Sequence, residues 1–380
     1  MDSQPPSGGM PPAQPPPILA YQYPVAPPRP PRRSRFWIAT TVVLAILFCL
    51  SLLANFQQLF ASLLPMGTLT THTAGPVLEE VLIEHAHSRN KIAVVSVQGI
   101  ITGSSLDGGA FSIVDLVKAQ LERAAEETAV RAIVLKVDSP GGEVLASDEI
   151  YKAIAEFQEE HHKPVVASMG SVAASGGYYV SAPCQWIVAN ELTITGSIGV
   201  ILQAMNFRGL MDKVGVRADV YKSGRFKDML SSTKRESDIS DEERAMVQKL
   251  VDESFARFKQ VIGEGRETAR DKNKTLSEPG RALNEQWERF ADGRVLSGKE
   301  AAELGFVDEL GDFKIAVQRA KKLAGIEEAR VVEFVPPFSF GSLFRLFGRA
   351  PSQHLGVELG IEFPKLKSGY LYFLSATVVR

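Results

Sequence analysis

Ser175 is the residue whose type and setting most directly indicate chemistry. It lies between Ala173-Ala174 and Gly176-Gly177 in the segment AASGG. Small flanking residues let the backbone approach a reacting carbonyl closely. A serine at a strand-to-helix turn also has backbone N–H groups near its hydroxyl, where an oxyanion would develop. The setting suits acyl transfer, but Ala173 stands where a nucleophile elbow has glycine, and similar turns often serve only packing, so other segments must decide.

A second small-residue turn, DSPGG at residues 138–142, precedes Ser175 by one strand-helix unit. A glycine pair at the carboxyl end of a parallel strand can aim free N–H groups at an anionic atom. Alone, this motif is more often an ordinary turn. Together with Ser175 it predicts an oxyanion hole with the amides of Gly142 and Gly176 as donors.

A nucleophilic serine needs a general base, and the six histidines offer no favourable setting. His161 and His162 end a charged stretch before Pro164, as expected of a solvated helix terminus. The other four lie before the expected folded domain or in the C-terminal tail. A Ser-His-Asp triad is therefore disfavoured, and lysine becomes the alternative base. The remaining histidines are His72, His85, His87 and His354.

Lys227 is the lysine that we expect to act as the base. A lysine can accept a proton only after its pKa has been lowered by burial or by a neighbouring cation. Lys227 lies beside Phe226 and Met229, which could desolvate it. Read alone it would be an ordinary surface lysine, and local sequence does not exclude Lys222 or Lys234.

The elements around these residues alternate between strands and helices. Apolar runs at 92–97, 130–137 and 164–167 indicate buried strands, and apolar residues at helical spacing in 113–127 and 144–157 indicate helices. This alternation predicts βαβ units and a mainly parallel sheet. The expected fold class is α/β, and a further helix is expected at 241–262.

Composition excludes several classes of protein. A chain of 380 residues with 45% hydrophobic residues can bury a sizeable core, and its net charge of -2 gives no support to nucleic-acid binding. The two cysteines, Cys49 and Cys184, are too isolated for a disulfide framework. There is no Cys/His cluster at metal-ligand spacing, and we expect neither a metal nor a cofactor.

The N-terminal region predicts a membrane anchor. Residues 1–35 are rich in proline, which favours a disordered, extended tail. Residues 36–60 form an uncharged apolar run long enough to span a bilayer and too long for a cleaved signal peptide. Arginines precede the run, so the positive-inside rule predicts a single-pass cell-membrane protein with a cytoplasmic tail and an extracytoplasmic main domain.

Several motifs together resemble the signal peptide peptidase A family of membrane-anchored serine proteases. The resemblance extends from about Lys91 to Leu323. It implies the crotonase-like, Clp-protease-like α/β fold. The matching segments are DSPGG at 138–142, AASGGYY at 173–179, TGSIG at 195–199, GRFKD at 224–228, DGRV at 292–295 and GFVDELG at 305–311.

The resemblance assigns a role to five residues. It implies Ser175 as the nucleophile, Lys227 as the general base and Ser197 as the serine that orients the lysine. It also implies that the amides of Gly142 and Gly176 form the oxyanion hole. The expected activity is hydrolysis of remnant signal peptides and other apolar peptides at the membrane.

The resemblance also bears on domain organisation. We expect a connecting segment at 61–90, a Ser-Lys protease domain at 91–325 and a C-terminal tail at 326–380. The family often has Ser-Pro after the catalytic lysine, whereas residues 231–233 are SST here. The chain has one copy of the core, and short members form homo-oligomeric rings in which serine and lysine meet across a protomer boundary.

Two alternatives from other classes remain open. A crotonase-type acyl-CoA enzyme would share the fold and the oxyanion hole, but a membrane anchor would separate it from cytosolic CoA. A catalytically silent membrane scaffold would lose nothing when Ser175 or Lys227 is replaced. Covalent labelling of Ser175 would argue against the acyl-CoA alternative.

Overall fold

The computed structural model describes residues 35–63, 76–104, 111–274, 276–277, 279–337 and 372–374. The chain divides into two units, Met1–His72 and Thr73–Arg380. The proline-rich tail predicted at 1–35 lies outside the described residues except at its last position. The same holds for the predicted C-terminal tail beyond 337, apart from a short segment at 372–374.

The first unit contains helix α1 (Arg35–Leu63), which confirms a helix over the apolar run. Its side chains are described at Trp37 and in residues 39–53. Within the part of the chain that the structure describes, no helix is both long and apolar enough to cross a membrane. The transmembrane role predicted for residues 36–60 stays a prediction.

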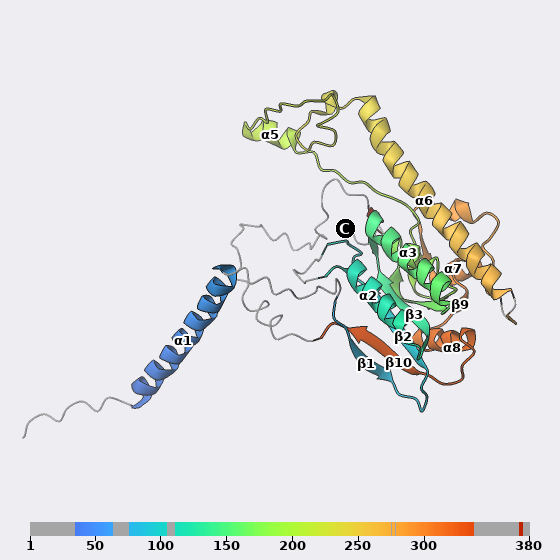
Figure 1. Cartoon of the computed structure of the whole chain (residues 1–380). Coiled ribbons are helices and arrows are strands. Elements are labelled where there is room, and N and C mark those ends of the chain that lie inside the picture. The colour runs from blue at the N-terminus through green and yellow to red at the C-terminus, as the bar shows by residue number, and fades with distance from the viewer. Residues whose placement is uncertain are drawn as a thin grey trace, which may run out of the picture. The chain divides into compact units, whose positions relative to one another are not determined.

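The second unit is built on one mixed, mostly parallel sheet (Figure 1). Its first strand pairs antiparallel with the second, and the strands that follow along the path pair parallel. In spatial order the strands are β1 (Glu79–Glu84), β10 (Arg330–Val335), β2 (Lys91–Gln98), β3 (Val130–Ser139), β5 (Val165–Ala173), β6 (Trp186–Ala189) and β9 (Glu309–Leu310). The predicted α/β class is confirmed.

The central strands read as continuous apolar runs because both faces of the sheet are covered. In β2, Ala93, Val95 and Val97 belong to one buried cluster, while Ile92 and Val94 belong to the cluster on the opposite face. Successive side chains of a strand point to opposite faces. A run without polar alternation is therefore what a central parallel strand requires.

Helices cover the two faces unequally (Figure 1). The first face is covered by α2 (Ile113–Glu126), α3 (Val144–His161) and α4 (Gly176–Ser181), which contribute buried residues to the first cluster. The opposite face is covered by α8 (Phe313–Leu323), which contributes Ala316, Val317 and Ala320 to the second cluster.

Short elements extend the sheet near the end of β5. Strand β7 (Ile194–Gly196) pairs with β5 in parallel and with β8 (Val295–Ser297) in antiparallel orientation. A separate two-stranded sheet joins β4 (Gly141–Glu143) to β11 (Tyr372–Leu374). Strands β1, β10 and β11 all lie outside the range 91–325, so the folded unit extends beyond the predicted domain on both sides.

The long helix α6 (Asp241–Asn273) continues well past the predicted 241–262. It begins with a capping box in which Ser240 and Glu243 satisfy each other's backbone amides. Residues 202–239, called the lobe below, precede it and contain α5 (Arg208–Val214) and the 3₁₀ helix η1 (Glu236–Asp238). The remaining helices in the described part of the chain are η2 (Trp287–Phe290) and α7 (Gly298–Glu303).

Candidate active site

Ser175 occupies the sharp turn between β5 and α4. Its backbone φ is 57° and its ψ is -116°, a combination that is strained for a residue with a side chain. Two hydrogen bonds hold the turn: the Ser175 amide donates to the carbonyl of Gly196 at 2.8 Å, and its carbonyl accepts from the amide of Tyr179 at 2.9 Å. Such local strain is typical of functional turns.

The hydroxyl of Ser175 is buried and has no hydrogen-bond partner among the described residues. A buried hydroxyl without a partner costs about 1–3 kcal/mol, so it requires an explanation. A buried hydroxyl that makes no other hydrogen bond is free to meet a general base and a scissile carbonyl.

The two predicted oxyanion turns are in direct contact. A Cβ atom added to Gly176 would lie 3.1 Å from the amide nitrogen of Gly142 and 2.7 Å from Ser147 Oγ. A Cβ atom added to Gly142 would lie only 1.8 Å from the carbonyl oxygen of Ile101. These glycines are therefore required by close backbone approach, and the structure brings Gly142 and Gly176 together beside Ser175.

An extended segment lies along the strand that contains Gly142. Residues of β11 pair antiparallel with β4, and Phe373 is the register partner of Gly142. On its other side, Tyr372 exchanges two backbone hydrogen bonds with Ile201, at 3.1 and 3.2 Å. The ring of Phe373 is buried and stacks on Tyr179 with a centroid distance of 4.9 Å.

Ser197 lies one residue after the carbonyl that holds the Ser175 turn. It is 4% exposed, and its amide donates to the carbonyl of Arg294 at 2.7 Å. Thr195 reinforces the same connection, because its Oγ1 donates to the carbonyl of Ala173 at 2.6 Å. The structure therefore places the segments of Ser175 and Ser197 side by side.

Helix α4, which follows Ser175, is anchored to α3 by a polar contact. The hydroxyl of Tyr179 donates to Asp148 at 2.7 Å. Burial and this hydrogen bond raise the pKa of Tyr179. Burial also opposes ionisation of Asp148, but hydrogen bonds from Lys152 and Tyr179 outweigh it and hold the pKa of that carboxyl below its usual range.

Lys227 is not brought to Ser175. It is exposed in the lobe, and among the described residues no hydrogen bond or ion pair engages its ammonium or joins it to Ser175. The other two candidate lysines differ, because Lys222 and Lys234 both pair with Asp228, at 2.7 and 3.4 Å. Lys222 and Lys234 are therefore both engaged in ion pairs, whereas Lys227 is not.

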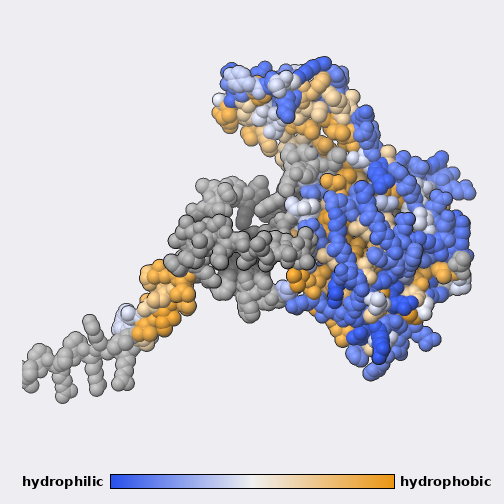
Figure 2. Space-filling model, viewed as in Figure 1, coloured by the Kyte–Doolittle hydropathy of each residue, from blue (hydrophilic) through white to orange (hydrophobic). Residues whose placement is uncertain are grey.

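The lobe exposes many large apolar side chains, visible as orange areas around α5 in Figure 2. Contiguous exposed apolar surface of this kind usually marks an interaction site. The exposed residues are Met205, Phe207, Leu210, Val214, Val216, Val220, Tyr221 and Leu230.

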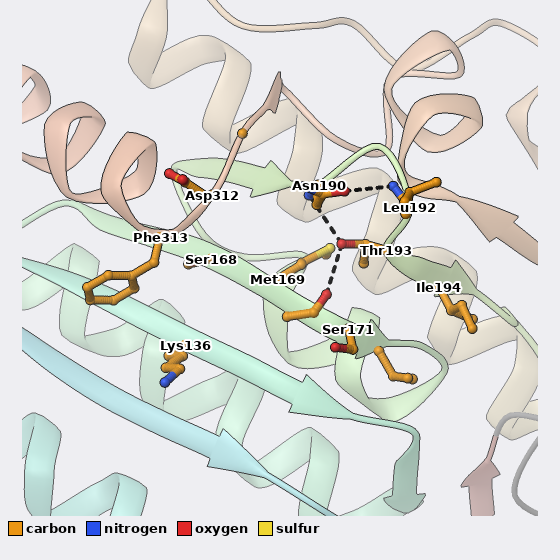
Figure 3. A pocket seen from close by; sticks show the side chains of 13 residues that line it. Lys136, Ser168, Met169, Ser171, Asn190, Leu192, Thr193, Ile194, Asp312 and Phe313 are labelled. Carbon is orange, nitrogen blue, oxygen red and sulfur yellow. Dashed lines mark hydrogen bonds between the residues drawn. The ribbon is translucent and has the colours of Figure 1, made fainter.

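A separate hollow of about 510 Å³ borders β5 (Figure 3). Met169 and Phe313 contribute to its mostly apolar lining, and Thr193 Oγ1 donates to the carbonyl of Gly170 at 2.8 Å. Ser175 is not among its lining residues, so this hollow is distinct from the serine turn. The described residues also contain no cluster of three His, Cys, Asp or Glu that could hold a metal.

The sequence matches two known protein families. Residues 157–327 match the family described as Peptidase family S49, and residues 99–184 match the family described as Clp protease. The second match confirms the expected Clp-protease-like fold.

Three relatives illustrate the similarity. A Synechocystis sp. protein named as a protease is 39% identical over 246 residues, covering 64% of this chain and 78% of that protein. A protein of Enterococcus faecium named as a signal peptide peptidase SppA is 36% identical over 262 residues, covering 68% and 70%. The chloroplast serine protease SPPA of Arabidopsis thaliana is 31% identical over 250 residues, covering 65% and 34%.

Proposed function

The chain belongs to peptidase family S49 as a serine peptidase of the SppA type, and we propose that it is an endopeptidase with a Ser175-Lys227 dyad. The observation that carries this proposal is the setting of Ser175. Its hydroxyl is buried without a described partner, on a strained turn in contact with Gly142. This is the arrangement that acyl transfer requires: a poised nucleophile beside backbone donors for the oxyanion.

Lys227 is the preferred base because its rivals are already paired. Lys222 and Lys234 lie against the carboxylate of Asp228, and a nearby carboxylate favours the charged form of an ammonium. An ammonium held in its charged form is a poor proton acceptor. Lys227 has no such partner in the described part of the chain, so its ammonium is free to meet Ser175.

The proposed reaction proceeds through an acyl-enzyme. Lys227 Nζ takes the proton of Ser175 as Oγ bonds to the scissile carbonyl carbon. The amides of Gly142 and Gly176 hold the resulting oxyanion. The carbon–nitrogen bond then breaks, and Lys227 returns the proton to the leaving amine. Water, deprotonated by Lys227, next attacks the acyl carbon and releases the carboxylate product and Ser175.

Ser197 has the proposed role of orienting the lysine. A hydroxyl that accepts a hydrogen bond from the Lys227 ammonium would fix its direction toward Ser175. The backbone connection from Gly196 to Ser175, at 2.8 Å, keeps Ser197 close to the nucleophile. The Ser197 hydroxyl would then contribute to catalysis by positioning the lysine, without contacting the reacting atoms.

We further propose that the lysine reaches Ser175 from a second copy of the chain, in a homo-oligomeric ring. Lys227 is exposed and unpaired within the described residues of its own chain. The surrounding lobe has an apolar surface that a second copy could cover (Figure 2). Both features are expected of a lobe that completes the site of a neighbour.

The proposed substrates are apolar peptides, including remnant signal peptides. The antiparallel pairing of β11 with β4 supports an extended substrate, since main-chain hydrogen bonds would hold a peptide and pockets would select its side chains.

We also propose a single-pass membrane anchor at 36–60, with a cytoplasmic N-terminus and an extracytoplasmic protease domain, because arginines precede the apolar run.

The deciding experiment is cleavage of a fluorogenic apolar peptide by the purified chain across pH. Ser175→Ala and Lys227→Ala should abolish cleavage, whereas Lys222→Ala should retain it. The wild-type rate should rise with pH as a lysine deprotonates, and a serine-directed covalent label should modify Ser175 alone. Undiminished cleavage by Ser175→Ala would refute the nucleophile, and absence of cleavage by the wild type would favour the acyl-CoA or scaffold alternatives.

A further inference from the structure

The turn that carries Lys227 lies among three carboxylates that are each paired with at least one cation, and two of them share Lys234. Asp228 Oδ1 lies 2.7 Å from Lys222 Nζ and 3.4 Å from Lys234 Nζ. Glu243 lies 2.5 Å from Lys234, and Glu242 lies 3.0 Å from Arg225. The described contacts therefore pair every one of these carboxylates while leaving Lys227 unpaired.

The central members of this group are shielded from water. The side chains of Asp228, Lys234 and Glu243 are 15%, 12% and 4% exposed. Ion pairs shielded from solvent are screened less by salt than exposed ones. The hydrogen bond that Lys234 donates to Glu243 raises the pKa of Lys234, and the hydrogen bond that Lys222 donates to Asp228 lowers the pKa of Asp228. The group is therefore charged and persistent at neutral pH.

The same contacts determine the path of the turn. Lys222 Nζ donates to the carbonyl of Arg225 at 3.1 Å as well as to Asp228. Glu243 belongs to the α6 capping box, since its side chain accepts from the amide of Ser240 at 3.0 Å. Asp228 is thus connected through Lys234 to the start of a long helix. Its side chain turns into the cluster, while the adjacent Lys227 is exposed.

From these contacts, and building on the proposed Ser-Lys function, we infer that Asp228 and Lys234 are positioning residues for Lys227. Asp228 connects the turn through Lys234 to the α6 capping box, and this connection fixes the direction in which the Lys227 side chain projects from the lobe. Lys234 forms ion pairs with Asp228 and Glu243 and thereby keeps both carboxylates from pairing with the Lys227 ammonium. Neither residue touches the reacting atoms.

The sign of each charge effect follows from the groups around the turn. Removing the negative charge of Asp228 leaves an excess of cations, which favours neutral Lys227 and lowers its pKa. Removing the positive charge of Lys234 leaves carboxylates undercompensated, which raises the pKa of Lys227. The charged groups of this region are Lys222, Arg225, Asp228 and Lys234 in the lobe, Asp238 in η1, and Glu242 and Glu243 in α6.

The test compares pH profiles of kcat/KM for Asp228→Asn and Lys234→Met in the whole chain. The acid limb should move to lower pH in the first variant and to higher pH in the second, each by about half a pH unit or more. The kcat of Asp228→Asn should also fall by about tenfold or more because the turn loosens, with little change in KM. A folding defect would lower the amplitude of both profiles without moving them in opposite directions.

Matched controls come from an exposed ion pair in the same lobe, between Arg217 and Asp219, whose side chains are 73% and 63% exposed. Asp219→Asn and Arg217→Met should leave the profile and kcat unchanged. Profiles of Asp228→Asn and Lys234→Met that match these controls would overturn the inference, as would shifts in the same direction. If Lys227→Ala itself stays active, the proposed dyad fails instead, so the two failures are distinguishable.

Discussion

The amide nitrogen of Ser175 lies 2.8 Å from the carbonyl oxygen of Gly196 and donates a hydrogen bond to it. Gly196 directly precedes Ser197, and both serines have positive φ, 57° and 49°. The relative position of the two serines is therefore set by a backbone connection between two strained turns. Thr195 supports this connection through its bond to Ala173.

Thr195→Val should weaken both stability and catalysis. The substitution keeps the shape of the side chain but removes the donor to the Ala173 carbonyl, so the free energy of unfolding should fall by about 1–3 kcal/mol. A displaced nucleophile turn should lower kcat by about tenfold. Thr195→Ser keeps the hydroxyl donor and should retain wild-type stability and kcat. Thr193→Val removes a hydroxyl that bonds to the carbonyl of Gly170, so it should lower stability with little effect on kcat. Denaturant unfolding and peptide cleavage measure the two effects; equal kcat losses in both valine variants would contradict the assignment.

Gly176→Ala should inactivate the enzyme. The added methyl group would lie 2.7 Å from Ser147 Oγ and 3.1 Å from the amide nitrogen of Gly142, so the two oxyanion turns must separate. Loss of one oxyanion donor lowers kcat by roughly 100- to 1,000-fold. Gly209→Ala is the control, because an added Cβ there meets nothing within 4 Å. A Gly176→Ala enzyme with normal kcat would show that this contact is not part of the oxyanion site.

Mixing the inactive Ser175→Ala and Lys227→Ala chains should restore cleavage if the dyad is shared between copies. In a randomly mixed ring, about a quarter of the boundaries would combine an intact serine with an intact lysine. We therefore expect about a quarter of the wild-type rate after subunit exchange. Mixing Ser175→Ala with the double variant should restore nothing. Complete absence of rescue in the first mixture would place both residues of the dyad in one chain.

Arg266→Met should be strongly destabilising. Arg266 and Asp308 form an ion pair with side chains only 3% and 2% exposed, and Asp308 also accepts from the amide of Ile187 at 2.8 Å. Removing the arginine leaves a buried, uncompensated carboxylate, at a cost of about 3–5 kcal/mol. Arg217→Met, at an exposed pair, should cost no more than about 1 kcal/mol. Equal midpoints in denaturant unfolding would argue against the buried pair.

Cys184 should resist alkylation until the protein unfolds. Burial raises the pKa of its thiol to about 12, so the reactive thiolate is about one part in 10⁴ at pH 8. In a Cys49→Ser variant, which leaves Cys184 as the remaining thiol of the two, iodoacetamide should react slowly in the native state and rapidly in denaturant. Mass spectrometry measures the difference, and fast native labelling would show that the thiol is accessible.

Some site residues had little sequence signal. Thr195 and Gly196 belong to the matched segment TGSIG, but nothing local indicates that they bond to the turn around Ser175. Asp228 follows Lys227 directly in GRFKD, yet its partner Lys234 is six residues away and Glu243 belongs to another element. Such roles depend on side-chain positions, which neither periodicity nor composition specifies.

Local pattern alone determined the α/β class, the approximate positions of the central strands and helices, and the serine turn between small residues. These features follow from apolar periodicity and from the steric freedom of small residues, both readable along the chain. Tertiary structure alone decided that β10 enters the sheet between β1 and β2, that β11 pairs with the strand of Gly142, and which candidate lysine is free of carboxylates. The physical reason is that strand partners and ion pairs join residues distant in sequence, so their choice depends on which surfaces the folded chain brings together.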